Sequence, residues 1–283
     1  MFGGEPNRFP FSLQRSLRHN EYTTNFDCHL FPSEIAHPIV RLRYVVIFSA
    51  LGLGLLAAMP TARSSIGAAL ECWSAIAFLG VALAYAWLGP RTFLKRSDGR
   101  LSVFSHLLFG PYQLANHVVL VLSGLIGGQP RFSEVAEGLY VGRRLHFWDT
   151  AAVRKLALTA VLDLTCEISE HDWVRKVPGY RLFRLLDRLA PTVSELDELA
   201  CWIALQRKSG PVYVHCALGH GRSVLCVAAY LLLAGYASTP EEAVQQIQRV
   251  RPRAHLSRPQ RECLAEFARQ LPTNSVHQLP ETG

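Results

Sequence analysis

The sequence is poor in charge, and poorest in lysine. Only 18% of its 283 residues are charged, and 4 of the 29 basic residues are lysine. A hydrophobic content of 49% is too high for one ordinary soluble domain and too low for a wholly embedded chain. We therefore expect a membrane part joined to a soluble domain. The formal charge of +7 suits anionic partners such as phospholipid headgroups or phosphorylated ligands, although arginine-rich coding in a GC-rich genome predicts the same composition.

Paired cysteines are also missing. The seven cysteines are odd in number and show no paired spacing, so the sequence indicates neither a disulfide framework nor a zinc site. A reducing compartment fits this pattern. The cysteines are Cys28, Cys72, Cys166, Cys201, Cys216, Cys226 and Cys263.

Long hydrophobic runs occur only in the first half of the chain. Tyr44 to Met59, extended by Pro60 to Ala62, and Ile66 to Gly89 are each long enough to cross a bilayer, and the short link predicts a helical hairpin. The first run starts too late for an ordinary signal peptide. We expect an arm at 1–39 and a membrane region at 40–128.

Basic residues predict the orientation of the hairpin. They lie before the first run and after the second, and Arg63 alone lies between the runs, so both ends should face the cytoplasm. Residues 103–128 are hydrophobic but contain His106, Pro111 and Asn116, which favours an interfacial or re-entrant segment over a third span. A third span would move the following domain across the membrane. The expected location is a bacterial inner membrane, with a multi-pass anchor and a cytoplasmic domain.

From residue 132 the pattern alternates between strands and helices. Leu158 to Thr165 and Tyr180 to Leu186 are predicted strands, and Thr192 to Lys208 is a predicted helix opened by a capping box. A further helix starts at Thr239. Residues 132–283 should form an α/β domain with a mainly parallel sheet flanked by helices.

One stretch of this domain, Pro211 to Ser223, predicts an anion site. A short buried strand leads into a loop with two glycines and then into a helix from Ser223 to Ala234. Backbone N–H groups and the helix N-terminus would converge on a phosphate, and Cys216 at the mouth of the loop is expected to ionise to a nucleophilic thiolate. Arg222 could grip two phosphate oxygens. The same Cys to Arg spacing at Cys201 and Cys263 lies in helical patterns without glycine.

The run His215 to Ser223 resembles the signature loop of the Cys-dependent dual-specificity phosphatases in the protein tyrosine phosphatase superfamily. The resemblance covers about residues 133–271 and includes Glu137 to Gly142. Pro240 to Val244 and Arg251 to Gln260 are most similar to the phosphatidylglycerophosphate phosphatase-like branch. Ala217 and His220 replace basic residues that this branch often carries.

The resemblance implies a role for each loop residue and requires no metal or cofactor. Asp187 matches the general acid by its place at the end of a strand, with Asp163 as the competing candidate. His220 could either add positive charge below about pH 6.5 or simply fill the loop. The role of Gln260 stays open. The implied roles are the nucleophile Cys216, phosphate binding by Ala217, Leu218, Gly219, His220, Gly221 and Arg222, thiolate stabilisation by Ser223, and ordering of the loop by His215.

The sequence thus predicts a membrane-anchored phosphatase that forms a phosphocysteine intermediate and acts on a lipid phosphate such as phosphatidylglycerophosphate. The expected partners are a phosphorylated substrate and a membrane, not nucleic acid. The alternatives are a tethered phosphotyrosine or dual-specificity protein phosphatase and a catalytically weak phosphate-binding adaptor. A sulfur transferase of the rhodanese type would not need Arg222. The arginines between Arg249 and Arg261 either face a membrane or form a solvated surface.

Overall fold

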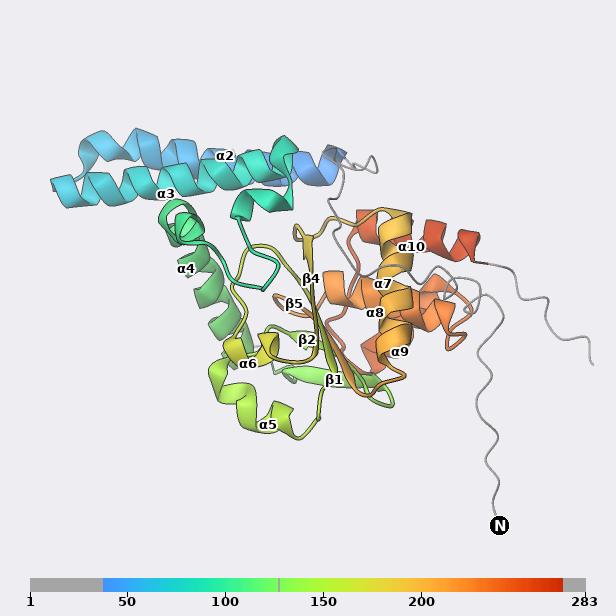
Figure 1. The fold of residues 1–283 in the computed structure, drawn as a ribbon. Helices are drawn as coiled ribbons and strands as arrows, with labels where there is room; N and C mark the ends of the chain where they lie inside the picture. The colour runs from blue at the N-terminus through green and yellow to red at the C-terminus, as the bar shows by residue number, and fades with distance from the viewer. Residues whose placement is uncertain (1–37, 127, 272–283) are drawn as a thin grey trace, which may run out of the picture.

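The computed structural model describes residues 38–126 and 128–271. An antiparallel pair of long helices lies against an α/β body, and a third long helix runs down the side of that body (Figure 1). The predicted arm at 1–39 falls almost entirely outside the described residues.

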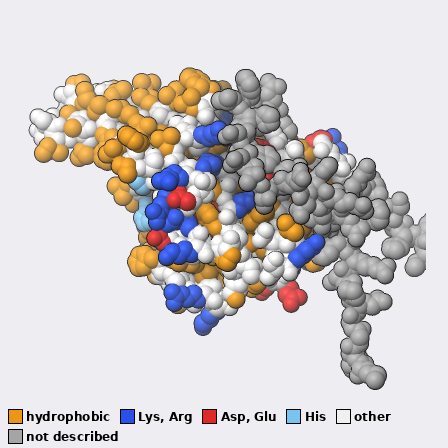
Figure 2. All heavy atoms as spheres, viewed as in Figure 1, with side chains coloured by type: hydrophobic (Ala, Val, Ile, Leu, Met, Phe, Trp, Pro, Cys, Tyr) orange, Lys and Arg blue, Asp and Glu red, His pale blue; other side chains and the backbone are white. Residues whose placement is uncertain are grey.

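The paired helices form the predicted hairpin. Helix α2 spans Pro38–Ala58, and helix α3 spans Ser65–Leu83 with its N-terminus capped by the Ser64 side chain. A short 3-10 turn, Met59–Thr61, lies at the tip, and a π-helical turn, Ala84–Leu88, continues α3. Within the described ranges, two stretches are long and apolar enough to cross a membrane by length and composition, 39–61 and 65–88. Hydrophobic side chains cover the hairpin in Figure 2.

The third long helix, α4, spans Val103–Ile126. It is not one of the two candidate spans. The preference for an interfacial or re-entrant segment stays a prediction of the sequence. The helix nevertheless continues through Pro111 without a break. Proline cannot donate to the carbonyl four residues earlier, and here that carbonyl, Leu107 O, accepts the indole N–H of Trp73 at 2.6 Å. A contact from α3 thus satisfies the group that Pro111 leaves free.

The segment between α3 and α4 packs on the α/β body. After the 3-10 turn Pro90–Phe93, Lys95 and Leu101 form an isolated antiparallel bridge. The carbonyl of Gly99 accepts the N–H of Glu170 at 2.9 Å, and the carbonyl of Lys95 accepts Arg184 Nε at 2.8 Å. These bonds tie the base of the hairpin to the body.

The body is built on a five-stranded sheet in the order β1-β2-β5-β3-β4. Only the β1–β2 pair is antiparallel, so the predicted mainly parallel sheet is confirmed. The strand β5 lies in the centre with neighbours on both sides, and its five residues are all buried. The strands are β1 Phe132–Ala136, β2 Leu139–Arg143, β3 Ala160–Thr165, β4 Gly179–Leu185 and β5 Val212–Cys216.

Helices cover both faces of the sheet. Helices α7 to α10 pack with the sheet in the main core, and α5 and α6 contribute to a smaller cluster with Val161 and Tyr213 (Figure 1). The predicted capping box at Thr192 is present, and the Thr239 side chain caps α9. The helices are α5 Thr150–Arg154, α6 Asp172–Arg175, α7 Val193–Gln206, α8 Arg222–Leu233, α9 Pro240–Val250 and α10 Arg258–Gln270, with a 3-10 turn at Phe147–Asp149.

Candidate active site

The loop between β5 and α8 is held open by hydrogen bonds on its outer side. Four successive backbone carbonyls of the loop accept hydrogen bonds from groups outside it. In a trans peptide the N–H points away from the C=O, so the N–H groups of these four peptides point toward the interior of the loop. One of those amides, Gly219 N–H, donates to Cys216 Sγ at 3.2 Å. The loop therefore has the form of an anion cradle at a helix N-terminus. The outward bonds are Arg144 N to Ala217 O at 3.0 Å, Arg251 Nη2 to Leu218 O at 2.9 Å, Arg251 Nε to Gly219 O at 2.6 Å and His255 N to His220 O at 2.8 Å.

Glycine is required at position 219. Its φ of +72° lies in the left-handed region, and a Cβ there would lie 2.3 Å from the carbonyl carbon and oxygen of Gly142. The loop can thus press against the backbone of β2 only because position 219 has no side chain.

Cys216 ends β5 and lies in the mouth of the loop. Its Sγ lies 3.5 Å from the hydroxyl of Ser223, in the first turn of α8. Both groups are buried, and Cys216 lines a cavity. The thiol and the hydroxyl are close enough for the hydroxyl to support a departing thiolate.

Arg222 is fixed along one edge. Its terminal nitrogens bond both carboxylate oxygens of Glu167, Nη1 at 3.1 Å and Nη2 at 2.7 Å, and Nη1 also donates to Leu185 O at 2.8 Å. Arg222 Nε lies 3.4 Å from Asp187 Oδ1 but makes no hydrogen bond. The side edge of the guanidinium, Nε with the second hydrogen of Nη2, thus stays available for two oxygens of one phosphate.

This pair is buried, and the charge of each partner stabilises the other. Burial acts to raise the pKa of Glu167, but Arg222 and its hydrogen bonds outweigh burial and the pKa is lowered. Burial acts to lower the pKa of Arg222, but Glu167 and Asp187 raise it well above its ordinary value. Sequence reasoning missed Glu167. The available signal was its place just after β3, at the carboxyl edge of the sheet where Cys216 also lies.

Asp187 follows β4 and lines the same cavity as Cys216 and Arg222. Its side chain is 54% exposed, as a group that exchanges protons with substrate and water requires. Three side chains hold the backbone of its turn, which has a positive φ at Arg188. They are Tyr85, whose hydroxyl donates to Asp187 O at 3.4 Å, Ser257, which donates to Arg188 O at 2.7 Å, and Gln260, which donates to Leu189 O at 3.1 Å.

Asp163, the competing acid candidate, lies elsewhere. It is fully buried in β3, and Lys95 Nζ bonds its carboxylate at 2.7 Å. Its pKa is strongly lowered, because Lys95 and His215 outweigh the effect of burial. A buried, paired carboxylate away from the cavity is a structural group, and the geometry favours Asp187 as the acid.

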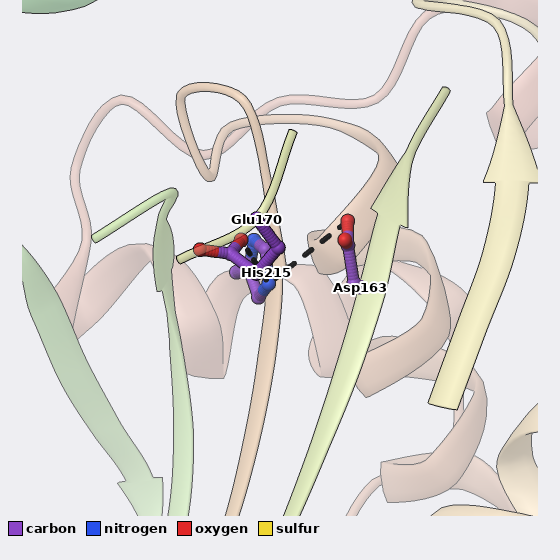
Figure 3. Close-up of side chains that lie close together, drawn as sticks. All are labelled: Asp163, Glu170 and His215. Atoms are coloured by element: carbon purple, nitrogen blue, oxygen red, sulfur yellow. Dashed lines mark ion pairs between the residues drawn. The ribbon is translucent and has the colours of Figure 1, made fainter. Parts of the chain in front are cut away.

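His215 lies beside this buried pair. Figure 3 shows the His215 side chain close to Glu170 and Asp163, with His215 Nε2 3.4 Å from Glu170 Oε2 and 4.0 Å from Asp163 Oδ1. Its Nδ1 lies 3.4 Å from the carbonyl oxygen of Cys216, and its ring stacks on Tyr213. The three side chains in Figure 3 are close enough to hold a metal ion, but the Lys95 ammonium already supplies a cation to Asp163.

The structure bears on the alternatives for two basic residues. Burial, with Arg251, His255 and Arg253 nearby, lowers the pKa of His220 to about 4, which favours the loop-filling alternative over the charged one. Its Nε2 instead pairs with Gln129 Oε1 at 2.8 Å. Arg251 is only 1% exposed and holds the loop carbonyls, so it belongs to no membrane-facing or solvated surface.

The site opens into a cavity of about 380 Å³. The floor comes from the loop, with Asp187 and Glu167 beside it, and one wall comes from α2, α3 and α4. The base of the hairpin also shares a buried cluster with Leu186 and Leu189, next to Asp187. The helical region and the α/β body thus enclose the site together.

Comparison with known proteins points to one family. The family described as dual specificity phosphatase, catalytic domain, matches residues 139–270. Phosphatidylglycerophosphatase and protein-tyrosine phosphatase 1 of Homo sapiens is 43% identical over 105 residues, 36% of this chain and 52% of the relative. The Rattus norvegicus protein is 40% identical over 60 residues, 21% of this chain and 31% of the relative. This chain spans about half the length of the human relative and less than a third of the length of the rat relative.

Solved structures are similar to about half of the chain. Tk-PTP in its active form is 24% identical and covers 50% of this chain and 99% of its own at a TM-score of 0.45. PTPMT1 in complex with PI(5)P is 24% identical and covers 50% of this chain and 96% of its own at a TM-score of 0.43. On the family match, residues 139–270 of this chain belong to the dual specificity phosphatase catalytic domains.

Proposed function

We propose that the protein is a membrane-anchored phosphatase that hydrolyses a lipid phosphomonoester, with phosphatidylglycerophosphate as the leading candidate. One observation carries the proposal. A single cavity contains Cys216, Arg222 and Asp187, and apolar helices form its wall. The name of the human relative, a phosphatidylglycerophosphatase, supports the choice of lipid.

In the first step we propose, Cys216 Sγ attacks the phosphorus of the bound ester. The S–P bond forms as the ester P–O bond breaks, and the leaving oxygen takes a proton from Asp187. The side edge of Arg222 and the inward N–H groups stabilise the charge on the phosphoryl oxygens. Acid catalysis of this kind contributes about 10² to 10⁴ in rate.

In the second step, water attacks the phosphocysteine. The Asp187 carboxylate accepts a proton from the water, the S–P bond breaks, and the electron pair returns to Sγ. The Ser223 hydroxyl, 3.5 Å from Sγ, then donates to the thiolate. Inorganic phosphate and the regenerated enzyme are the products.

The membrane part of the proposal rests on α2 and α3. The start of α2 and the end of α3 both lie near the catalytic body, and the tip at Met59–Thr61 lies away from it (Figure 1). We infer that residues 40–128 act as the membrane region, that 132–283 act as the catalytic domain, and that both ends of the hairpin face the cytoplasm. A reporter fused after Gly283 should report the cytoplasmic side, and a reporter found across the membrane would contradict this topology. The bacterial inner membrane stays a prediction of the sequence.

A tethered protein phosphatase is the second candidate, because the name of the relative also includes protein-tyrosine phosphatase. An adaptor that only binds phosphate is a poorer fit, since it would not need an exposed carboxylate beside the phosphate loop. The sulfur transferase alternative leaves Arg222 without a role.

The test is phosphate release by the full-length protein in mixed micelles. We expect phosphatidylglycerophosphate to be hydrolysed with a higher kcat/KM than any phosphotyrosine peptide, and Cys216→Ser to abolish turnover. Cys201→Ser and Cys263→Ser are the matched controls, because both cysteines lie in helices away from the cavity. A preference for the peptides would assign the site to phosphoproteins, and full activity of the Cys216 variant would overturn the mechanism.

A further inference from the structure

The wall opposite the phosphate loop is built from aromatic rings. Phe48 of α2 lies at its centre, and four rings surround it at centroid distances of 5.7 to 6.2 Å. Interlocked rings of this kind have little rotamer freedom and form a preformed surface. The surrounding rings are Tyr44 of α2, Phe78 of α3, Tyr85 at the end of α3 and Tyr112 of α4.

These rings border the same space as the proposed catalytic residues. Together with Val119 and Leu120 they line the same cavity as Cys216 and Arg222. The cavity therefore has a floor with the loop N–H groups and Arg222, which suits a phosphate, and an apolar wall that suits hydrocarbon. Its volume of about 380 Å³ lies within the range of small-molecule sites, about 300 to 1,000 Å³.

The wall also continues into the hairpin. Tyr44 and Phe48 belong to the first half of α2, and Phe78 belongs to the second half of α3, so the wall lies in the half of the hairpin nearer the body. Beyond it, both helices expose hydrophobic side chains along their length, as Figure 2 shows. A hydrocarbon chain that lies along these helices would meet the aromatic rings at the base of the hairpin.

We propose that this aromatic wall binds the hydrocarbon part of a membrane lipid monophosphate, so that α2, α3 and α4 form part of the substrate site as well as an anchor. The inference rests on the proposed function and specifies how the site selects its substrate class. Side chains on three helices supply the selectivity, and all three precede the domain that carries the nucleophile. A phosphopeptide would leave this wall facing polar backbone.

A chain-length series tests the wall. The full-length protein in a neutral detergent is given n-alkyl phosphates from ethyl to dodecyl, and kcat/KM is measured for each. For the wild type we expect kcat/KM to rise with every methylene that enters the cavity, by up to about fourfold each, and then to level off. Phe48→Ser should flatten this rise and lower the ratio of dodecyl to ethyl phosphate by at least tenfold.

The ratio of the kcat/KM values for dodecyl and ethyl phosphate does not depend on the fraction of the protein that is folded. The partition of each substrate into micelles is the same for the variant and the wild type. Leu53→Ser is the matched control, because Leu53 is exposed on α2 and does not line the cavity. It should keep the wild-type ratio. Equal ratios in the wild type and Phe48→Ser would overturn the wall as a subsite while leaving the phosphatase function intact.

Other outcomes separate the inference from the function. Failure to hydrolyse any alkyl phosphate, with no difference between wild type and Cys216→Ser, would refute the proposed function itself. A phosphoserine peptide, whose leaving group is also an alkyl oxygen, with a higher kcat/KM than every alkyl phosphate would assign the aromatic wall to a peptide and overturn the inference.

Discussion

Glu167 holds the terminal edge of the Arg222 guanidinium through two hydrogen bonds, at 3.1 and 2.7 Å, and leaves Nε on the side edge without a hydrogen bond, 3.4 Å from Asp187 Oδ1. The carboxylate thereby fixes the orientation in which the arginine would meet a phosphate. An arginine has many rotamers, and this pairing removes that freedom before substrate arrives.

Glu167→Gln should weaken catalysis without removing any group that touches the substrate. A charge-assisted bond contributes about 1.5 to 3 kcal/mol, so kcat/KM should fall about 10-fold to 100-fold. Steady-state kinetics on an aryl phosphate measures the loss. Glu198→Gln is the control, because Glu198 pairs with Arg181 on the surface and should change kcat/KM little.

Glu167→Gln should also change how the stability of the folded protein depends on pH. The pKa of Glu167 is lowered in the folded protein, so its stabilising contribution is present above its ordinary pKa of 4.5 and is lost as pH falls through the folded value. The stability difference between wild type and Glu167→Gln in urea should therefore shrink as the pH drops below about 4.5. A difference that grows there would contradict the assignment.

Asp187→Asn should slow poor leaving groups far more than good ones. Only a poor leaving group needs a proton as the P–O bond breaks, so the loss should be about 10² to 10⁴ for an alkyl phosphate and much smaller for a nitrophenyl phosphate. Single-turnover rates on both substrates give the comparison. Equal losses would return Asp187 to a structural role.

Lys95→Met should destabilise the catalytic body although Lys95 lies before the first strand. The substitution leaves Asp163 buried without its ammonium partner, a change that costs about 3 to 5 kcal/mol. Urea unfolding followed by near-UV circular dichroism measures this cost, and adding Asp163→Asn should recover part of it. Lys176→Met, at an exposed position, is the matched control.

The lowered pKa values of three histidines predict that the folded protein loses stability in mild acid. Burial, reinforced by neighbouring arginines, lowers the pKa values of His146, His171 and His220 to about 4. Between pH 6.5 and about 4 the unfolded chain binds protons that the folded protein does not, so stability should fall as pH falls through this window and stay level above it. His220→Gln should make the fall shallower, which urea midpoints at several pH values would show. An unchanged slope would refute the neutral state of His220 in the folded protein.

The phosphate loop was predictable because its signal is contiguous. Cys216, Gly219, Gly221 and Arg222 lie within seven positions of a strand-to-helix turn, and local geometry alone brings them together. The mainly parallel sheet was predictable for a similar reason, since alternating strand and helix patterns imply crossovers.

The supporting groups were not predictable in this way. Glu167 lies 55 residues before Arg222, Lys95 lies 68 residues before Asp163, and Arg251 lies 32 residues after Gly219. Each contact depends on how separate elements dock, and no local pattern marks a charged residue as buried. The arginines from 249 to 261 look alike in sequence, yet one of them is buried under the loop and four are exposed.

The bond between Lys95 and Asp163 also bears on how the chain is assembled during synthesis. Lys95 leaves the ribosome 68 residues before its partner, directly after the two apolar helices, so the bond cannot form until β3 has been synthesised. The α/β body therefore completes its fold after the hairpin has been synthesised, and it packs on the base of that hairpin. The smallest cooperative folding unit would then begin near Pro90, and a chain cut between residues 102 and 132 would lose a cation that the sheet needs.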